Sequence, residues 1–104
     1  MKRIKRRYLA LQLEYETLPS ERELIDAVWA SNTKLYGEVG ASTTGLSLIN
    51  FDMEQKIAVI RISLSSLNMV KASVSTITSI SGKVAAVHVL AVSGTLKALF
   101  SDLK

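Results

Sequence analysis

The chain of 104 residues contains no cysteine, one histidine and one proline. Without cysteine it forms no disulfide, no thiolate metal site and no cysteine nucleophile, and one histidine is too few for a histidine-rich zinc site. No apolar run approaches the ~18 residues of a membrane-spanning helix. These absences exclude several classes of metalloprotein and membrane protein, and we expect a cytoplasmic protein without a membrane contact.

Carboxylates are absent from Gln55 to Ser101, where five basic side chains give a charge of +5. Residues 8–54 carry two basic and eight acidic side chains, a charge of −6. Such a split favours two kinds of neighbour, a polyanion for the basic parts and a protein for the acidic part, although a merely solvated surface is the alternative. The N-terminus adds a further +5 from Lys2, Arg3, Lys5, Arg6 and Arg7.

Four segments have the pattern of β-strands. Residues 7–15 alternate between apolar and polar positions, which is the period of a strand with one buried face. Residues 46–52 and 57–64 are separated by a short turn, as in a hairpin. In residues 84–93, apolar side chains occupy odd and even positions alike, so other parts of the protein are expected to cover both faces of this strand.

Three segments are predicted to be helical. Ser20 and Glu23 form a capping box after Pro19, so a helix begins near Glu21, and Gly37 ends it. Residues 65–81 repeat apolar side chains at helical spacing, which favours a helix, although the β-branched residues in 73–78 could also form a strand. Residues 96–103 form a short last helix. The first helix has an apolar stripe made of Leu24, Ile25, Val28, Trp29, Leu35 and Tyr36.

The element order β-α-β-β-α-β predicts an α+β fold, a ferredoxin-like or RRM-like sandwich with a four-stranded antiparallel sheet and a short C-terminal helix. The usual strand order, 4-1-3-2, places the apolar fourth strand at an edge. The final helix or a partner chain then has to cover its second face. We expect a single domain over residues 7–104, preceded by a basic tail at residues 1–6.

The sequence lacks residues that other proteins of this fold use for RNA binding or for catalysis. The third strand has no aromatic residue, so an RNA-stacking platform is not predicted. The segment after Tyr15 lacks the glycine and arginine of an acylphosphatase loop, and residues 38–45 are interpreted as a connector. Asp52 and Glu54 are attributed to turn chemistry in preference to metal binding. We predict that the chain alone is not a catalyst and binds no cofactor.

The open face of the predicted sheet has the mixed character of a protein interface. His88 on this face could be a ligand or a base, but a buried structural role is the favoured interpretation. The side chains assigned to the face are Ala10, Gln12, Leu48, Val59, Arg61, Ala86 and His88.

Motifs spread along the chain resemble those of one family. They are Arg7-Tyr8-Leu9, Trp29, Gly37-Glu38-Val39-Gly40, Ile60-Arg61 and the segment Val92-Ser93-Gly94-Thr95-Leu96-Lys97. In order and spacing the chain is similar to the small ribonuclease P protein called Pop-five, or ribonuclease P protein component 2 in archaea.

The resemblance implies a non-catalytic subunit of the ribonucleoprotein that removes 5′ leaders from precursor tRNA. The RNA subunit would hydrolyse the phosphodiester with Mg²⁺. The implied partners are the ribonuclease P RNA, the TIM-barrel subunit component 3 and the other ribonuclease P proteins, with a second copy of this chain as a further option. Ala10, Leu48, Val59, Ala86 and His88 are the expected partner interface.

Basic side chains are the expected RNA contacts, because cations on a protein neutralise phosphates. The turn before the last helix is a second contact, since amides at a helix N-terminus can hold a phosphate; a simple helix cap is the alternative. The full predicted set is Lys2, Arg3, Lys5, Arg6, Arg7, Arg61, Lys71, Lys83, Ser93, Gly94, Thr95 and Lys97.

A competing hypothesis is a small-molecule regulatory domain of the same ferredoxin-like topology, dimerising through its sheet. Such a domain would carry a ligand loop after the first strand. Thr17-Leu18-Pro19 is a short segment for that role.

Overall fold

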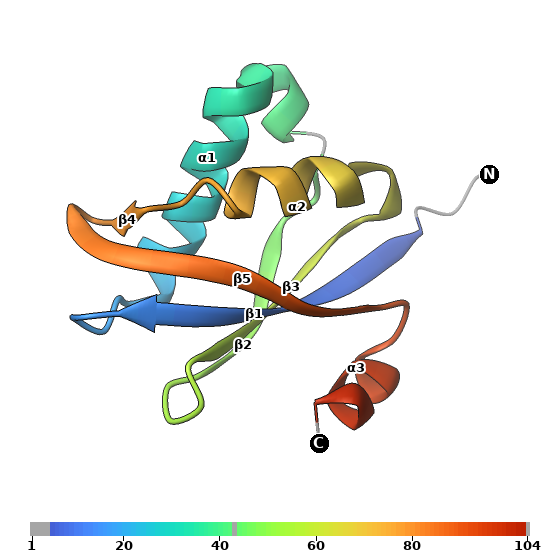
Figure 1. The fold of residues 1–104 in the computed structure, drawn as a ribbon. Helices are drawn as coiled ribbons and strands as arrows, with labels where there is room; N and C mark the ends of the chain where they lie inside the picture. The colour runs from blue at the N-terminus through green and yellow to red at the C-terminus, as the bar shows by residue number, and fades with distance from the viewer. Residues whose placement is uncertain (1–4, 43, 104) are drawn as a thin grey trace.

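The computed structural model describes residues 5–42 and 44–103, with side chains for residues 5–37 and 44–103. Five antiparallel strands form one sheet in the order β2-β3-β1-β5-β4 (Figure 1). The α+β class and the order of the first four predicted strands are confirmed. The strands are β1 (Arg6–Tyr15), β2 (Ser47–Asp52), β3 (Ile57–Ser63), β4 (Ser79–Ile80) and β5 (Lys83–Ser93).

The prediction of four strands is wrong, because the two-residue strand β4 is added beyond β5. Ser79 pairs with Val84 and Ile80 pairs with Lys83. The predicted helix over residues 65–81 is correct only for its first half, since α2 spans Leu67–Val74 after a 3₁₀ turn at Leu64–Ser66. The β-branched residues that follow favour extended backbone and place Ile77 and Ile80 in the core.

The helix α1 (Glu21–Ser42) begins at the predicted capping box. The Glu23 carboxylate accepts the backbone N–H of Ser20 at 2.9 Å, and the Ser20 hydroxyl accepts the N–H of Glu23 at 3.1 Å. Gly37 breaks the helical backbone with φ 77 and ψ 171, but a helical turn continues through residues 38–42, which corrects the prediction of a loop there.

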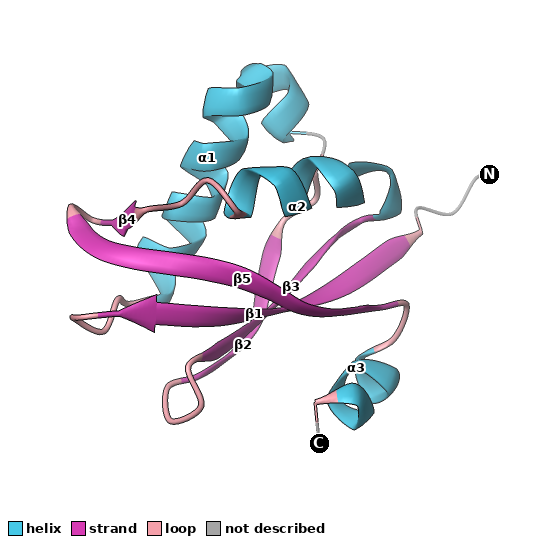
Figure 2. Cartoon of the chain, viewed as in Figure 1, coloured by secondary structure: helices cyan, strands magenta, loops and turns pink. Residues whose placement is uncertain are grey.

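The predicted apolar stripe of α1 is wrong at Trp29, Leu35 and Tyr36, which are exposed. The buried face is centred on Leu24 and Val28, and Trp29 lies about 100° around the helix from Val28. The far end of α1 rises past α2 and away from the sheet (Figures 1 and 2).

The main core lies between the sheet and the helices α1 and α2. Leu9, Leu11 and Leu13 of β1 point into it and are buried, as the alternation in the sequence predicts. Within this layer the buried Ser73 hydroxyl of α2 donates a hydrogen bond to the amide oxygen of Asn32 in α1. This polar contact links the two helices and satisfies the amide oxygen of the buried Asn32, while the Ser73 hydroxyl also lies 3.0 Å from the carbonyl of Val70.

A smaller core lies on the other face of the sheet, under α3 (Leu96–Asp102). Ala10, Val59 and Leu99 are buried together there. The final helix, one of the two covers expected for the second face of the last strand, packs against Ala91 of β5, whereas Val84 and Leu90 of that strand stay exposed. Ala10 and Val59, being buried, are not on an open surface, which corrects their assignment to a partner interface.

Leu48 also departs from the predicted interface, because its side chain packs against the main core. The pairing of β2 with β3 shifts between Leu48 and Asn50, where a bulge adds one residue. A one-residue shift exchanges the faces of a strand, so alternation alone placed Leu48 on the wrong side.

Leu99→Ala should lower the free energy of unfolding by about 2–5 kcal/mol, because it empties the centre of the smaller core. Urea denaturation monitored by circular dichroism measures the loss. Phe100→Ala, at an exposed neighbouring position, is the control and should cost much less. Equal losses for the two variants would contradict the packing of α3 on the sheet.

Hydrogen bonding from Ser81 and from Ser20 lowers the pKa of Glu23 below its usual value of 4.5, and the charge of Lys83 acts in the same direction. The ionised carboxylate therefore adds stability above pH 4.5 that is lost as the pH falls through the lowered pKa. Glu23→Gln keeps a side chain that suits a capping box, so it isolates the charge.

At about pH 7 the wild type should be more stable to urea than Glu23→Gln, and the difference should vanish once the pH has fallen below the lowered pKa of Glu23. Glu54→Gln, in the exposed hairpin turn, is the control. A difference between wild type and Glu23→Gln that is constant with pH would show that the carboxylate charge contributes nothing.

Candidate nucleic-acid interface

The pairing of the strands brings basic segments from three parts of the chain to one end of the sheet. Arg6 lies opposite Ser63 at the end of β3, and Tyr8 lies between Arg61 of β3 and Ser93 of β5. We call this end the basic pole, defined as Lys5, Arg6, Arg7, Arg61 and residues 93–97.

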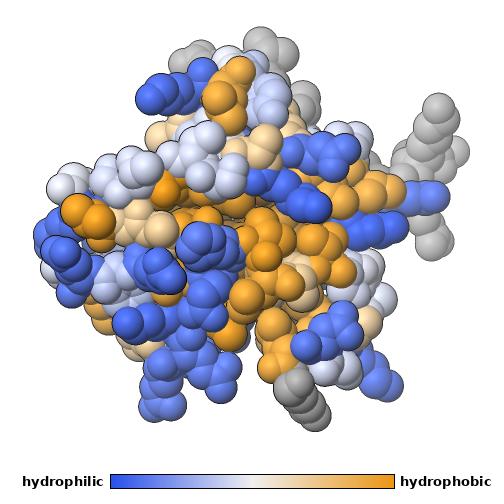
Figure 3. Space-filling view, in the orientation of Figure 1, coloured by the Kyte–Doolittle hydropathy of each residue, from blue (hydrophilic) through white to orange (hydrophobic). Residues whose placement is uncertain are grey.

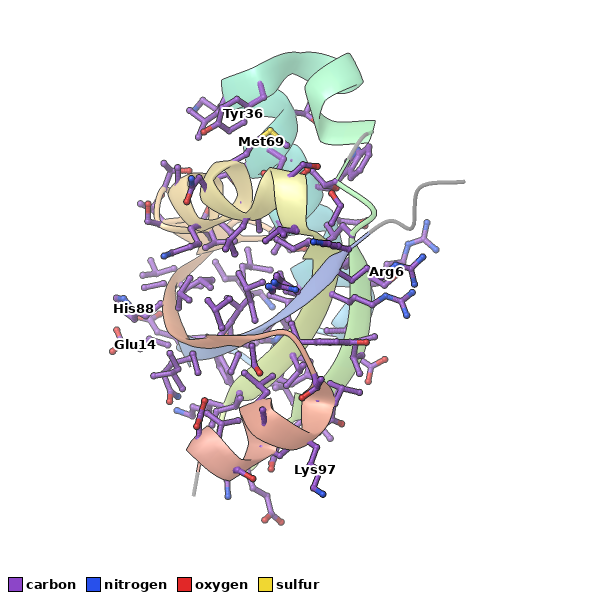
Figure 4. All side chains as sticks on the ribbon, turned by 90° about the vertical axis from the view of Figure 1, so that its right-hand side faces the viewer. Arg6, Glu14, Tyr36, Met69, His88 and Lys97 are labelled. Atoms are coloured by element: carbon purple, nitrogen blue, oxygen red, sulfur yellow. The ribbon has the colours of Figure 1, made fainter. Side chains whose placement is uncertain are left out.

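Arg6 and Arg61 lie on the same face of the sheet, as diagonal neighbours across β1 and β3. Arg6 is exposed and reaches away from the sheet (Figure 4). Arg61 is half-buried, and its Nε is buried without a hydrogen-bond partner among the described residues. The two guanidinium groups give this face an electropositive end next to Tyr8.

Tyr8 is absent from the set of residues predicted to form a site, because the sequence shows only that it stands at the end of a strand. It is half-buried, and its register places it directly between the Arg61 and Ser93 positions. Only the pairing of β1 with both neighbours reveals this position.

Arg7 points to the opposite face and lies against the turn that follows β5. Its Nη1 donates to the carbonyl of Arg6 at 2.9 Å. A Cβ atom at Gly94 would lie 3.4 Å from the same nitrogen. The glycine thus lets the guanidinium of Arg7 approach the backbone of the turn closely.

The Ser93–Thr95 turn acts as a helix cap. The Thr95 hydroxyl accepts the N–H of Ala98 at 3.2 Å, and the Ser93 hydroxyl accepts the N–H of Thr95 at 3.4 Å. These amides therefore already have acceptors within the chain. The geometry supports the cap, which was the alternative to a phosphate-binding turn.

Two of the predicted RNA contacts are lysines on helices. Lys71 is exposed on α2, and Lys97 projects from α3 (Figure 4). Lys83 begins β5 at the opposite end of the sheet, where its charge acts on Glu23, so the fold does not bring it to the basic pole. Lys2 and Arg3 lie outside the described residues.

Carboxylates gather at the end of the sheet away from the basic pole. The end of β1, the start of α1 and the β2–β3 hairpin meet there, which is the expected result of antiparallel pairing. Hydrophilic side chains occupy both ends of the molecule, with hydrophobic side chains between them (Figure 3). The acidic pole comprises Glu14, Glu16, Glu21, Glu23, Asp52 and Glu54.

His88 is exposed, which corrects its interpretation as a buried structural residue. Its Nε2 lies 3.8 Å from a carboxylate oxygen of Glu14 on the neighbouring strand, with 59% of the histidine side chain exposed (Figure 4). Ala86 is half-buried beside it on the same face. The role of these two residues in a partner interface stays a prediction.

The described part of the chain contains no group of three or more histidine, cysteine, aspartate or glutamate side chains able to hold a metal ion. Asp52 accepts the N–H groups of Glu54 and Gln55 at 3.0 and 3.1 Å. Its predicted role in the turn is confirmed. No helix in the described ranges is long and apolar enough to cross a membrane.

Comparison with known proteins decides the family. A family model described as "Rpp14/Pop5 family" matches residues 7–104. The chain belongs to the Rpp14/Pop5 family. The resemblance inferred from the sequence motifs is thereby confirmed.

Relatives of this Rpp14/Pop5 protein carry the name ribonuclease P protein component 2. The protein from Methanosarcina barkeri is 37% identical over 95 residues, which cover 91% of this chain and 69% of the relative. The protein from Methanosarcina mazei is 36% identical, covering 91% and 80%. The protein from Pyrococcus furiosus is 32% identical, covering 93% and 81%.

The fold is shared with a chain in the cryo-EM structure of yeast ribonuclease MRP. The TM-score is 0.73 and the sequence identity is 18%. The match covers 92% of this chain and 79% of the matched chain in that structure. At that identity the comparison supports the arrangement of strands and helices alone.

Proposed function

We propose that this Rpp14/Pop5 protein is a non-catalytic subunit of ribonuclease P that supports RNA-catalysed removal of the 5′ leader from precursor tRNA. Membership of the family and the name of the archaeal relatives support the assignment. The single structural observation that carries it is the basic pole, where Arg6 and Arg61 lie on one face. The family match favours this function over a small-molecule regulatory domain.

The proposed mechanism is electrostatic. Folding of a large RNA brings phosphates together, and their repulsion opposes the compact state. Cationic side chains held on a rigid sheet neutralise some of those phosphates and so favour the compact catalytic RNA at lower Mg²⁺. The RNA holds the Mg²⁺ and performs the hydrolysis, while the protein holds its cations in place.

The partners in this proposal are the ribonuclease P RNA, component 3 with its TIM-barrel fold, and the other ribonuclease P proteins, in the cytoplasm. The RNA would contact the basic pole, because the acidic pole repels phosphate. Protein partners would use the surfaces left free at the ends and edges of the sheet. A second copy of the chain is a further option for the exposed edge of β5.

Arg6→Ala should reduce the salt dependence of binding to the ribonuclease P RNA, with the slope of log K against log salt falling by about 0.7–0.9 for each phosphate that the protein no longer neutralises. Filter binding over a series of KCl concentrations measures the slope. Lys83→Ala removes an equally exposed cation far from the basic pole and should leave the slope unchanged. An unchanged slope for Arg6→Ala, or an equal change for Lys83→Ala, would place the RNA elsewhere.

Precursor-tRNA cleavage by the cognate catalytic RNA at limiting Mg²⁺ should be stimulated by this chain together with component 3, and by neither protein alone. The reason is that the pair presents one continuous surface to the RNA. The assay compares the rate with each protein, with both and with neither, and RNA active at high Mg²⁺ is the control. Folded proteins that leave the rate unchanged would overturn the assignment, and a thermal-shift screen with amino acids would then test the regulatory domain.

A further inference from the structure

The acidic pole contains a hollow of about 320 Å³ that the proposed RNA contacts do not use. It lies between the segment after β1, the first turn of α1 and the β2–β3 hairpin. Its lining includes Leu18, Pro19, Glu21, Glu23, Phe51 and Met53.

Large apolar side chains at this hollow are open to solvent. Leu18 is 48% exposed and Met53 is 60% exposed, and they come from two connections that are distant in sequence. Phe51 is half-buried, packs against the main core and gives the hollow a fixed floor. Exposed apolar residues scattered singly are ordinary, whereas two that line the same concave site can be covered by one apolar group.

Two carboxylates line the hollow, and two more are next to Met53 in sequence. Glu21 and Glu23 stand on the side formed by α1, and Glu23 is held in place by the N–H of Ser20. Asp52 and Glu54 flank Met53 in the hairpin. The hollow thus has an apolar centre and a negatively charged rim.

The cations nearest in sequence to this rim are engaged with other groups. Arg22 pairs with Asp26 at 3.8 Å, and the Nζ of Lys56 lies 4.9 Å from the centre of the Tyr15 ring. Lys83 offsets part of the charge of Glu23. The rim remains acidic overall, so it repels a nucleic acid and attracts a cationic segment of a protein.

We propose that this hollow docks a segment of a partner protein in which an aliphatic or aromatic side chain is flanked by lysine or arginine. The apolar side chain fills the space between Leu18 and Met53, and the flanking cations meet the carboxylates of the rim. This division follows the usual anatomy of interfaces, in which a few buried anchors supply affinity and rim charges supply steering. The proposal does not depend on the RNA assignment, because it concerns the opposite pole.

The probe is the capped peptide Arg-Lys-Leu-Phe-Lys-Arg, titrated into the ¹⁵N-labelled full chain and followed by NMR. Shifts should concentrate at residues 18–23 and 51–54. Met53→Ser should weaken binding by about tenfold or more, since it removes an apolar side chain from the anchor site and leaves the charge of the rim unchanged. Val84→Ser, which removes an apolar side chain at a position that is 66% exposed on β5, is the matched control and should bind as the wild type does.

In a second peptide, serines replace leucine and phenylalanine, so the charges remain and the apolar anchor is removed. This peptide should bind about tenfold more weakly than the first. Equal binding of the two peptides, equal weakening by the two variants, shifts at the basic pole, or no binding at millimolar peptide would each overturn the proposal. Unfolding curves for both variants confirm that they are folded. Retained RNA binding by Met53→Ser would show that the loss of peptide binding is independent of the proposed RNA function.

Discussion

The pairing of β1 with β3 on one side and with β5 on the other is the constraint on which the rest of the structure depends. Because both pairings are antiparallel, the start of β1 meets the ends of β3 and β5, and its end meets their beginnings. A basic N-terminus is thereby brought to Arg61 and to the Ser93–Thr95 turn. The carboxylates that follow β1 are brought to those of the hairpin. Two electrostatic poles result from one set of backbone hydrogen bonds.

The middle of the sheet contributes stability and leaves the ends for binding. The helices α1 and α2 cover one face, and α3 covers the centre of the other through Leu99, Ala10 and Val59. Ferredoxin-like domains often present an open sheet face, but here that face is filled along much of β1. Among the described residues, the free surfaces include the two poles, the outer edge of β2, the part of the β5 edge beyond β4, and the flank of α1 that carries Trp29 and Tyr36. Function is therefore expected at the ends of strands.

Local patterns predicted the parts of the fold that depend on neighbours in sequence. The alternation of β1 and the Ser20–Glu23 capping box both have the predicted form. Features that depend on tertiary contacts were missed: the bulge that turns Leu48 inward, and the burial of Ala10 and Val59 beneath the predicted last helix. The candidate site likewise has a part that local sequence predicts and a part that only tertiary contacts reveal. Charge counts predicted basic and acidic regions, but only the register shows that Arg61 joins the N-terminus and that Lys83 does not.

The distance between the poles determines whether they can work at once. The ten residues of β1 extend about 34 Å at ~3.4 Å per residue. Exposed charges are largely screened beyond a Debye length of about 8 Å at physiological ionic strength. The carboxylates of the acidic pole therefore reduce the proposed attraction of the basic pole for phosphate only slightly. The RNA proposed at one end and the cationic segment proposed at the other are thus compatible on a chain this small, because the length of β1 separates the two poles by several screening lengths.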